Sequence, residues 1–420
     1  MVPAISPVRR LFRRLGPGLI TGAADDDPSG IATYSQAGAA FGYQLGWTVV
    51  ISLPLMVAVQ EISARIGRVT GAGLGAALRR HAPAPVLLGM VGLLLVANVI
   101  NLAADIGAMA DAAQMLAGGP SAAWAVGFAL FCVTAEIWIS YRPYTLLLKW
   151  LTLSLLAYVA LLLVVNVPWR AALGGALLPR IEFTRDAPTT LVAVLGTTIS
   201  PYLFFWQAAE EVEDEAAEVD PRPLRVHSQD AGPEMARINF DTWVGMGYSN
   251  AISLAIIIGT AATLHASGAT TIATATDAAA ALAPIAGRFA QLVFALGIIG
   301  TGLLAVPVLA GSAAYAVAEA SAWPAGLSRQ ALEARGFYGT LAGATLLGVG
   351  IVFSPLDPMR ALFWSAVING VVAAPMIMAM VALASSPRVM GSLVLPLWLR
   401  ALGWTSGVAM AAATIGMLVL

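Results

Sequence analysis

Three consecutive carboxylates, Asp25, Asp26 and Asp27, stand inside an apolar stretch and are followed by Pro-Ser-Gly over 28–30. The proline removes a backbone donor and disfavours helical backbone at Asp27, and the glycine adds flexibility, so we expect the helix to unwind there into two half-helices. A carboxylate at the centre of a membrane helix costs about 2.5–3.5 kcal/mol, so three of them indicate a functional site. Asp25 and Asp26 could instead lie in an inner vestibule and only cap the broken helix ends.

A second apolar stretch is interrupted in the same way by Gly-Thr-Thr-Ile-Ser-Pro-Tyr over 196–202. Two broken helices in corresponding positions of two halves are typical of an inverted-repeat transporter with its site at the repeat interface. The backbone carbonyls of Thr197 and Thr198 and the carboxylate of Asp27 would then converge as ligands. Oxygen donors suit hard cations such as Mg²⁺ or Ca²⁺, with Mn²⁺ also admissible. Pro201 alone could also be a simple packing kink.

The composition places these residues in a membrane. Of the 420 residues, 59% are apolar and 11% are charged, the mean hydropathy is +0.82, and soluble domains have about 25% charged residues. The net charge of −1 gives no reason to expect a nucleic-acid partner. Cys132 is the only cysteine, which excludes a disulfide framework and a cysteine metal site. We expect no cofactor, because the metal would be the transported substrate.

Apolar runs bounded by Pro, Gly or charge predict an all-α membrane protein with eleven transmembrane helices in a single transporter domain over 1–420. The two inverted repeats would cover about 16–168 and 190–383, with an extra helix over 399–420. The predicted spans are 16–41, 45–66, 84–117, 121–141, 146–168, 190–212, 240–266, 286–320, 337–353, 359–383 and 399–420.

The basic residues predict the orientation. With a cytoplasmic N-terminus, the outer loops keep only Arg170, Arg180, Arg185, Arg288 and Arg360, as the positive-inside rule requires. We therefore expect an integral protein of the cell (inner) membrane whose first helix is retained. The longest polar segment would be cytoplasmic and either a solvated loop or a regulatory or cation-collecting element; it covers 213–237.

Several segments of the chain resemble those of a known family. The segments 16–18, 27–30 and 36–39 (Gly-Pro-Gly, Asp-Pro-Ser-Gly and Gln-Ala-Gly-Ala) look like the first helix of the natural resistance-associated macrophage protein (NRAMP) divalent-metal transporters. The segment 196–207 is similar to the sixth helix of that family. The resemblance implies a LeuT-type fold of five plus five helices with helices 1 and 6 broken. It also implies that Asp27 binds the metal and that Thr197 provides a backbone carbonyl.

Two departures from the family concern the ion. Gly30 stands where the family has an asparagine ligand, and Ser200 where it has a methionine. Loss of the thioether removes a soft ligand that favours transition metals, and two small residues enlarge the site. The chain therefore resembles the NRAMP-related magnesium transporter branch, which implies transport of Mg²⁺ and Mn²⁺.

Other departures concern the proton route. Tyr202 and Gln207 stand where the family has histidines, and Ala108 replaces a glutamate, whereas Asp105 matches an acidic residue of that route. The resemblance to the magnesium branch implies weak or absent proton coupling. The alternative is a proton-coupled Mn²⁺ or Fe²⁺ transporter.

Further polar residues could serve the pathway or merely stabilise the helices. Asp105 shares one helical face with two asparagines, which could line the cavity or bond neighbouring helices. Glu210 and Glu211 could draw a cation toward the cytoplasm or form a solvated helix end. Asn369 could reach the site or serve packing.

Two other functions share features with this sequence. A Na⁺-coupled amino-acid carrier has the same broken helices, but three aspartates would crowd negative charge where a substrate carboxylate must bind. An intramembrane aspartyl enzyme would need paired carboxylates, and Asp27 and Asp105 lack the Gly-x-Gly-Asp setting of such enzymes. We therefore expect a transporter, not an enzyme, with a divalent cation and the lipid bilayer as its partners; the oligomeric state stays open.

Overall fold

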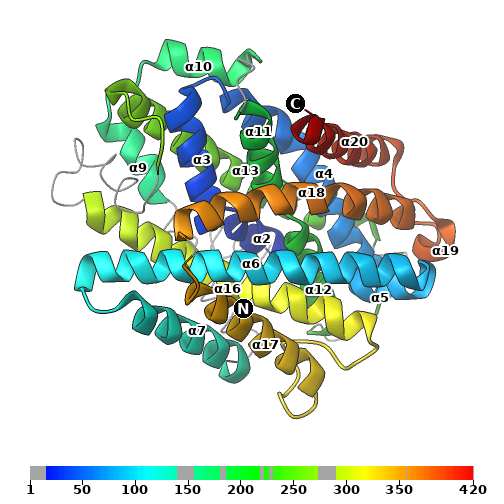
Figure 1. Ribbon diagram of the computed structural model, residues 1–420. Coiled ribbons are helices and arrows are strands. Elements are labelled where there is room, and N and C mark those ends of the chain that lie inside the picture. The colour runs from blue at the N-terminus through cyan, green and yellow to red at the C-terminus, as the bar shows by residue number, and fades with distance from the viewer. Residues whose placement is uncertain are drawn as a thin grey trace, which may run out of the picture.

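The computed structural model describes residues 16–139, 156–179, 186–217, 222–226, 229, 231–272, 290–355 and 357–419, and this part of the chain contains helices and connections but no strand (Figure 1). The helices are α2 (Pro17–Asp25), α3 (Pro28–Phe41), α4 (Gly46–Thr70), α5 (Leu74–His81), α6 (Ala84–Ala117), α7 (Ser121–Trp138), α9 (Leu156–Val164), α10 (Trp169–Leu177), α11 (Ala187–Thr198), α12 (Pro201–Ala216), α13 (Ala231–Thr260), the π-helical turn η3 (Ala261–His265), α16 (Ala290–Ala320), α17 (Arg335–Val352), α18 (Pro358–Ala384), α19 (Pro387–Met390) and α20 (Leu397–Val419).

Eight helical segments in the described residues are long and apolar enough to cross a membrane. The all-helical class is thereby confirmed, whereas the number of eleven spans stays a prediction. The first predicted span is divided into two short helices, and the start of the fifth, 146–155, lies outside the described residues. The eight segments are Gly46–Thr70, Ala84–Ala117, Ser121–Trp138, Ala187–Ala216, Ala231–His265, Phe294–Ala320, Pro358–Ala384 and Leu397–Val419.

Both predicted helix breaks are present. Between α2 and α3, Asp26 has φ −88° and ψ 51°, and Asp27 is extended with φ −66° and ψ 172°. Between α11 and α12, Ile199 has φ −124° and ψ 65°, and Ser200 has φ −80° and ψ 127°. In each case a proline is the first residue of the next helix, because proline is tolerated at that position but restricts the residue before it.

The second break is shorter than the sequence pattern predicted. Thr197 and Thr198 were expected in unwound backbone, but they form the last turn of α11. Only Ile199 and Ser200 are non-helical, since the restriction imposed by Pro201 acts on the residue directly before it. The carbonyls of the last turn still lack a helical partner, so the correction leaves their ability to bind a ligand unchanged.

Long helices surround the broken ones. The helix α6 crosses the bundle and packs against α16, α17 and α18; in Figure 1, α18 and α17 lie on opposite sides of α6, and α16 crosses it. Glycines permit the closest crossings: a side chain at Gly22 would collide with the backbone of Gly245 in α13, and one at Gly196 with the backbone of Ala366 and Gly370 in α18. Such small-residue contacts are typical of membrane helix packing.

The outward-facing surface of the bundle is apolar. Leu88 of α6 is 67% exposed, Leu130 of α7 60% and Leu346 of α17 65%. In a soluble monomer such a surface would be unusual, but in a bilayer it faces lipid. The described structure therefore fits an integral membrane protein.

Two short helices and one polar segment differ from the sequence-based expectation. The helices α5 and α10 were not predicted; α10 lies beside Gly46 at the start of α4, and α5 follows the end of α4, so they lie at opposite ends of the bundle (Figure 1). The interpretation of 213–237 as a solvated loop is wrong at the two ends of this segment, whereas Arg222, Arg225 and Val226 in its middle are exposed and lie outside helices. The helices α12 and α13 extend into it, and Glu213 is buried, accepting a hydrogen bond from Tyr315 Oη over 2.9 Å.

Candidate functional site

Asp27 is the N-cap residue of α3 and lies in the first break, 1% exposed. Its Oδ1 accepts hydrogen bonds from the Ser29 hydroxyl and the Gly30 backbone N–H, both over 2.6 Å. Its Oδ2 accepts one from the Tyr202 hydroxyl over 3.2 Å. The carboxylate is therefore fixed by α3 through one oxygen, and it presents the other oxygen toward α12.

The second break carries its own hydroxyl. Ser200 stands at the N-cap position of α12 but does not cap that helix with its side chain. Its Oγ instead donates back to the last turn of α11, to the Thr197 carbonyl over 2.9 Å and the Gly196 carbonyl over 3.0 Å. The carbonyl that the sequence assigned as a ligand thus accepts a hydrogen bond from Ser200.

The two breaks lie against each other. The Tyr202 hydroxyl donates both to Asp27 and to the Ala24 carbonyl, the latter over 2.8 Å. Tyr34 Oη and Thr198 Oγ1 form a hydrogen bond over 3.0 Å. A Cβ atom at Gly30 would lie 3.1 Å from Thr197 Oγ1, so α3 and α11 approach each other closely at this glycine.

Asp25 and Asp26 point away from this pair of breaks toward α13. Asp25 Oδ2 accepts a hydrogen bond from the Ser249 hydroxyl over 2.9 Å, and Asp26 Oδ1 accepts one from Ser253 over 3.0 Å. Both carboxylates are fully buried. The two serines were not among the predicted residues; their i, i+4 spacing on an apolar span was the available signal. A vestibule role for the two aspartates stays a prediction.

The remaining predicted residues are also buried. Asp105 of α6 is fully buried, and α6 packs against α3, the helix that Asp27 caps. Gln207 of α12 is fully buried, and its amide makes no hydrogen bond to the described residues. Asn369 is 1% exposed on α18, a helix that packs on both α3 and α11. These placements are compatible with the predicted roles but do not test them.

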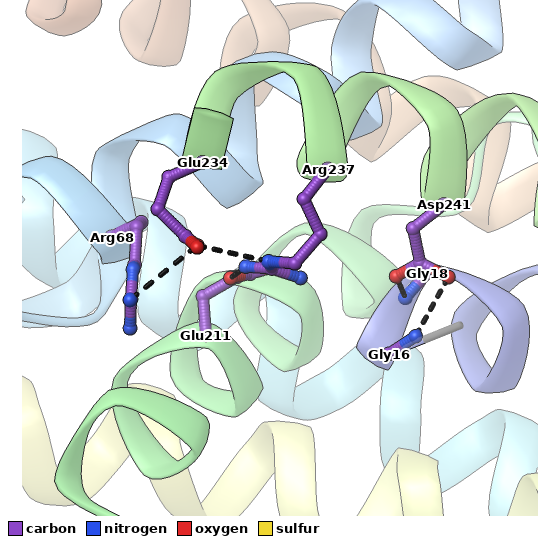
Figure 2. A network of polar contacts seen from close by, with 7 residues as sticks. All are labelled: Gly16, Gly18, Arg68, Glu211, Glu234, Arg237 and Asp241. Carbon is purple, nitrogen blue, oxygen red and sulfur yellow. Dashed lines mark hydrogen bonds and ion pairs between the residues drawn. The ribbon is translucent and has the colours of Figure 1, made fainter. Parts of the chain in front are cut away.

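A network of polar contacts that the sequence did not predict lies at the N-terminal end of α2 (Figure 2). Asp241 of α13 accepts hydrogen bonds from the backbone N–H groups of Gly16 and Gly18 over 2.9 and 2.7 Å, and so caps the N-terminus of α2. A carboxylate at this end also interacts favourably with the helix dipole. Asp241 is 223 and 225 residues away from its partners, so local sequence patterns carry no signal of the contact.

One turn earlier on α13, Arg237 extends the network. It pairs with Glu211 of α12 over 2.5 Å and with Glu234 over 2.9 Å, and Glu234 lies 3.4 Å from Arg68 of α4. Glu211, expected to draw a cation, is thus ion-paired in this conformation, and Glu210 is buried beside it. The network joins α2, α4, α12 and α13 at one end of the bundle (Figure 2).

A cavity of about 970 Å³ lies at the other side of the first break. It reaches α3 at Ala32, one turn after Pro28, and continues along that helix past Gln36 to Gln44 in the turn that follows it. Its opposite wall includes Thr190 of α11 and Phe363 of α18. The cavity therefore approaches the breaks from the α3 side, opposite to the network around the start of α2.

The described residues contain no group of three or more His, Cys, Asp or Glu side chains placed to hold a metal together. The donors that lie between the two breaks are the Asp27 carboxylate, backbone carbonyls and hydroxyls, since Asp25 and Asp26 are directed to serines of α13. Such a set suits a hard cation bound partly through water, as for Mg²⁺, which usually keeps several waters in protein sites.

An all-helical bundle of membrane-spanning length, with two broken helices meeting at a buried carboxylate, defines a membrane transporter. The chain belongs to the natural resistance-associated macrophage protein-like family, whose model matches residues 18–420. Proteins of this family are transporters and not enzymes, and they need no cofactor, because the metal is the transported substrate.

Solved structures share the fold. The Eremococcus coleocola manganese transporter in complex with an aromatic bis-isothiourea substituted compound superposes with a TM-score of 0.76 at 18% identity, covering 99% of this chain and 88% of that chain. A mutant of the same transporter gives a TM-score of 0.78 at 17% identity, covering 99% and 87%. Mhp1, a nucleobase-cation-symport-1 family transporter, gives 0.59 at 15% identity, covering 99% and 96%. At these identities the likeness extends to the fold alone.

Proposed function

We propose that this protein is a secondary transporter of divalent metal cations, Mg²⁺ or Mn²⁺ or both, across the cell membrane. The observation that carries the proposal is the position of Asp27: a fully buried carboxylate in a helix break, with Oδ1 held by α3 and Oδ2 directed at the second break. Membership in the NRAMP-like family and the shared fold of a manganese transporter support it.

The proposed ligands are Asp27 and the Thr197 carbonyl, with space provided by Gly30 and hydroxyl oxygen by Ser200. Neither break contains a thioether or imidazole, so the site offers no soft ligand to favour transition metals. Mg²⁺ dehydrates reluctantly and is commonly bound through one or two carboxylates and several waters. A single firm carboxylate among carbonyls and hydroxyls therefore favours Mg²⁺, with Mn²⁺ as a competing substrate.

Two further parts of the proposal concern the whole chain. The N-terminus is cytoplasmic, on the distribution of basic residues, and the chain is built of inverted repeats over about 16–168 and 190–383, on the matching positions of the two breaks. Transport is weakly coupled or uncoupled to protons, because Tyr202, Gln207 and Ala108 occupy the positions of titratable family residues.

A Na⁺-coupled amino-acid carrier is disfavoured by charge. The three aspartates over 25–27 are buried together, and a substrate carboxylate placed at this break would add a further negative charge without water to screen it. The buried carboxylates instead favour a cation.

The test is Asp27→Asn in proteoliposomes loaded with a metal-sensitive dye. The substitution keeps the volume and removes the charge that attracts the ion, so Mg²⁺ and Mn²⁺ uptake should fall to the level of empty liposomes. Asp357→Asn is the matched control, because Asp357 also caps its helix by accepting the backbone N–H three residues on, over 3.1 Å, but lies at the start of α18. Undiminished uptake by Asp27→Asn would disprove the site assignment.

A further inference from the structure

Both oxygen atoms proposed to bind the cation accept a hydrogen bond from a side-chain hydroxyl in this structure. Asp27 Oδ2 accepts from Tyr202 over 3.2 Å, and the Thr197 carbonyl accepts from Ser200 over 2.9 Å. The two hydroxyls flank Pro201 at the start of α12, and both residues are at most 1% exposed. Each hydroxyl can therefore place its hydrogen, which carries a partial positive charge, on an oxygen that the proposed function assigns to the cation.

Each hydroxyl also has a second acceptor within reach. The Tyr202 hydroxyl lies 2.8 Å from the Ala24 carbonyl, which is closer than Asp27. The Ser200 hydroxyl lies 3.0 Å from the Gly196 carbonyl. A hydroxyl has one hydrogen and two lone pairs, so its hydrogen can turn fully to the second carbonyl when a cation takes the first oxygen. No buried donor is then left unsatisfied, which would otherwise carry a large penalty.

We propose, resting on the transport function above, that Ser200 and Tyr202 determine the preference of the site for Mg²⁺ over Mn²⁺. In the empty site their hydrogens stand in for the cation on Asp27 and on the Thr197 carbonyl. In the loaded site the hydrogens turn to the Gly196 and Ala24 carbonyls, and the hydroxyl lone pairs face the ion.

The lone pairs act on the water that the ion keeps. Water bound to a divalent cation donates hydrogen bonds and needs acceptors, and the fully buried site offers no bulk solvent to supply them. The Ser200 and Tyr202 oxygens would provide two such acceptors. Mg²⁺ retains its water strongly, whereas Mn²⁺ is larger and releases water more readily, so Mg²⁺ depends more on these hydroxyls.

The experiment compares KM for Mg²⁺ and for Mn²⁺ in proteoliposomes for Ser200→Ala and Tyr202→Phe. Each variant removes one hydroxyl and little else. Because a hydrogen bond contributes a net factor of about 2- to 10-fold in an equilibrium constant, the KM for Mg²⁺ should rise about 2- to 10-fold in each variant. The KM for Mn²⁺ should stay constant or fall, since the ligand oxygens no longer have to lose a competing donor.

Two controls separate this role from a structural one. Tyr34→Phe also removes a buried hydroxyl at the breaks, but one that is bonded to Thr198 Oγ1 and to neither ligand oxygen; its ratio of the two KM values should equal that of the wild type. Ser200→Thr keeps the hydroxyl and should retain the wild-type ratio. If Ser200→Ala does not fold, calorimetric Mg²⁺ and Mn²⁺ affinities of the detergent-solubilised wild type and Tyr202→Phe test the proposal at Tyr202, with Ser200→Thr as the control that keeps its hydroxyl.

The outcomes are distinct. A ratio of KM values that is unchanged in Ser200→Ala and Tyr202→Phe, or changed equally in Tyr34→Phe, overturns this inference while wild-type uptake still supports the transport function. Absence of Mg²⁺ and Mn²⁺ uptake by the wild type overturns the proposed function, and this inference with it.

Discussion

Gly30 has no side chain, and we propose that this leaves space between the two breaks for an ion and its water. A Cβ atom at this position would lie 3.1 Å from Thr197 Oγ1 and 3.2 Å from the Asp25 carbonyl, closer than ordinary contact. We expect Gly30→Ala to narrow the space between the breaks and to lower Mg²⁺ uptake more than Mn²⁺ uptake, because Mg²⁺ enters with more of its water. Initial uptake rates of both ions measure the effect. Gly89→Ala is the control, since no atom lies within 4 Å of its added Cβ; an equal loss for both ions would contradict the expectation.

Whether a residue of the site could be predicted depends on whether the residues that reveal its role are close to it in the sequence. Asp27 could be predicted because the proline after it and the charge within an apolar run are neighbours in sequence. Ser249, Ser253 and Asp241 could not be assigned, because their partners in α2 lie more than 220 residues away. The hydroxyl contacts of Tyr202 likewise arise from the packing of α12 on α2. Local chemistry therefore identifies the proposed metal ligand, whereas the residues around it come from tertiary structure.

The same distinction applies to the helices. The breaks and the long spans were predictable from proline, glycine and hydrophobicity, and α6 has the predicted bounds of 84–117. The short helix α5 was not, because its N-terminus is stabilised by Glu319 of α16, which accepts a hydrogen bond from the Ala76 N–H over 3.2 Å. An eight-residue helix is marginal without such a tertiary contact.

The cap on α2 predicts a local change in dynamics. Asp241 holds both the Gly16 and Gly18 N–H groups, and Asp241→Asn leaves one acceptor oxygen and no charge. Since a helix cap contributes about 0.5–2 kcal/mol, opening of α2 should become roughly 2- to 30-fold more frequent. Hydrogen–deuterium exchange of peptides from α2 measures this. Asp111→Asn is the control, because Asp111 lies on α6 and accepts a hydrogen bond from Ser121, the first residue of α7. Unchanged exchange in α2 would contradict a capping role.

The crossing of α2 and α13 predicts a difference between two glycines of one helix. An added Cβ at Gly245 would collide with the backbone of Gly18 and Leu19, whereas one at Gly247 would meet no atom within 4 Å. Gly245→Ala should separate the helices and lower the melting temperature of the purified protein, because overpacking is destabilising by about 1–3 kcal/mol. Gly247→Ala should be neutral or stabilising, since alanine is the better helix former. Equal melting temperatures for both variants would contradict the close crossing.

In the whole molecule, the first break lies between a cavity on one side and a network of polar contacts on the other. The cavity of about 970 Å³ lies along α3, after the break. The contacts of Asp241, Arg237 and Glu211 join α13 to the start of α2, before the break, and to α12 (Figure 2). With the N-terminus in the cytoplasm, the cavity would face outward. The charged side chains that were expected to form an inner vestibule are buried or paired in this conformation, so such a vestibule requires a rearrangement of the network.

The last prediction concerns energy coupling across the whole chain. Coupled proton entry requires titratable groups that connect the site with the aqueous phase, and histidine is the side chain best suited to neutral pH. Among the described residues, His81 and His265 lie at the ends of α5 and η3 and not at the breaks, and Gln207 provides only a neutral amide. We therefore expect Mg²⁺ uptake into liposomes containing a lumenal pH dye to proceed without acidification, and to be insensitive to an imposed pH gradient. Adding a proton ionophore with a pH step shows that the dye responds. Asp105, buried on α6, is the remaining candidate relay. Metal-dependent acidification that disappears in Asp105→Asn would instead assign the protein to the proton-coupled transporters of its family.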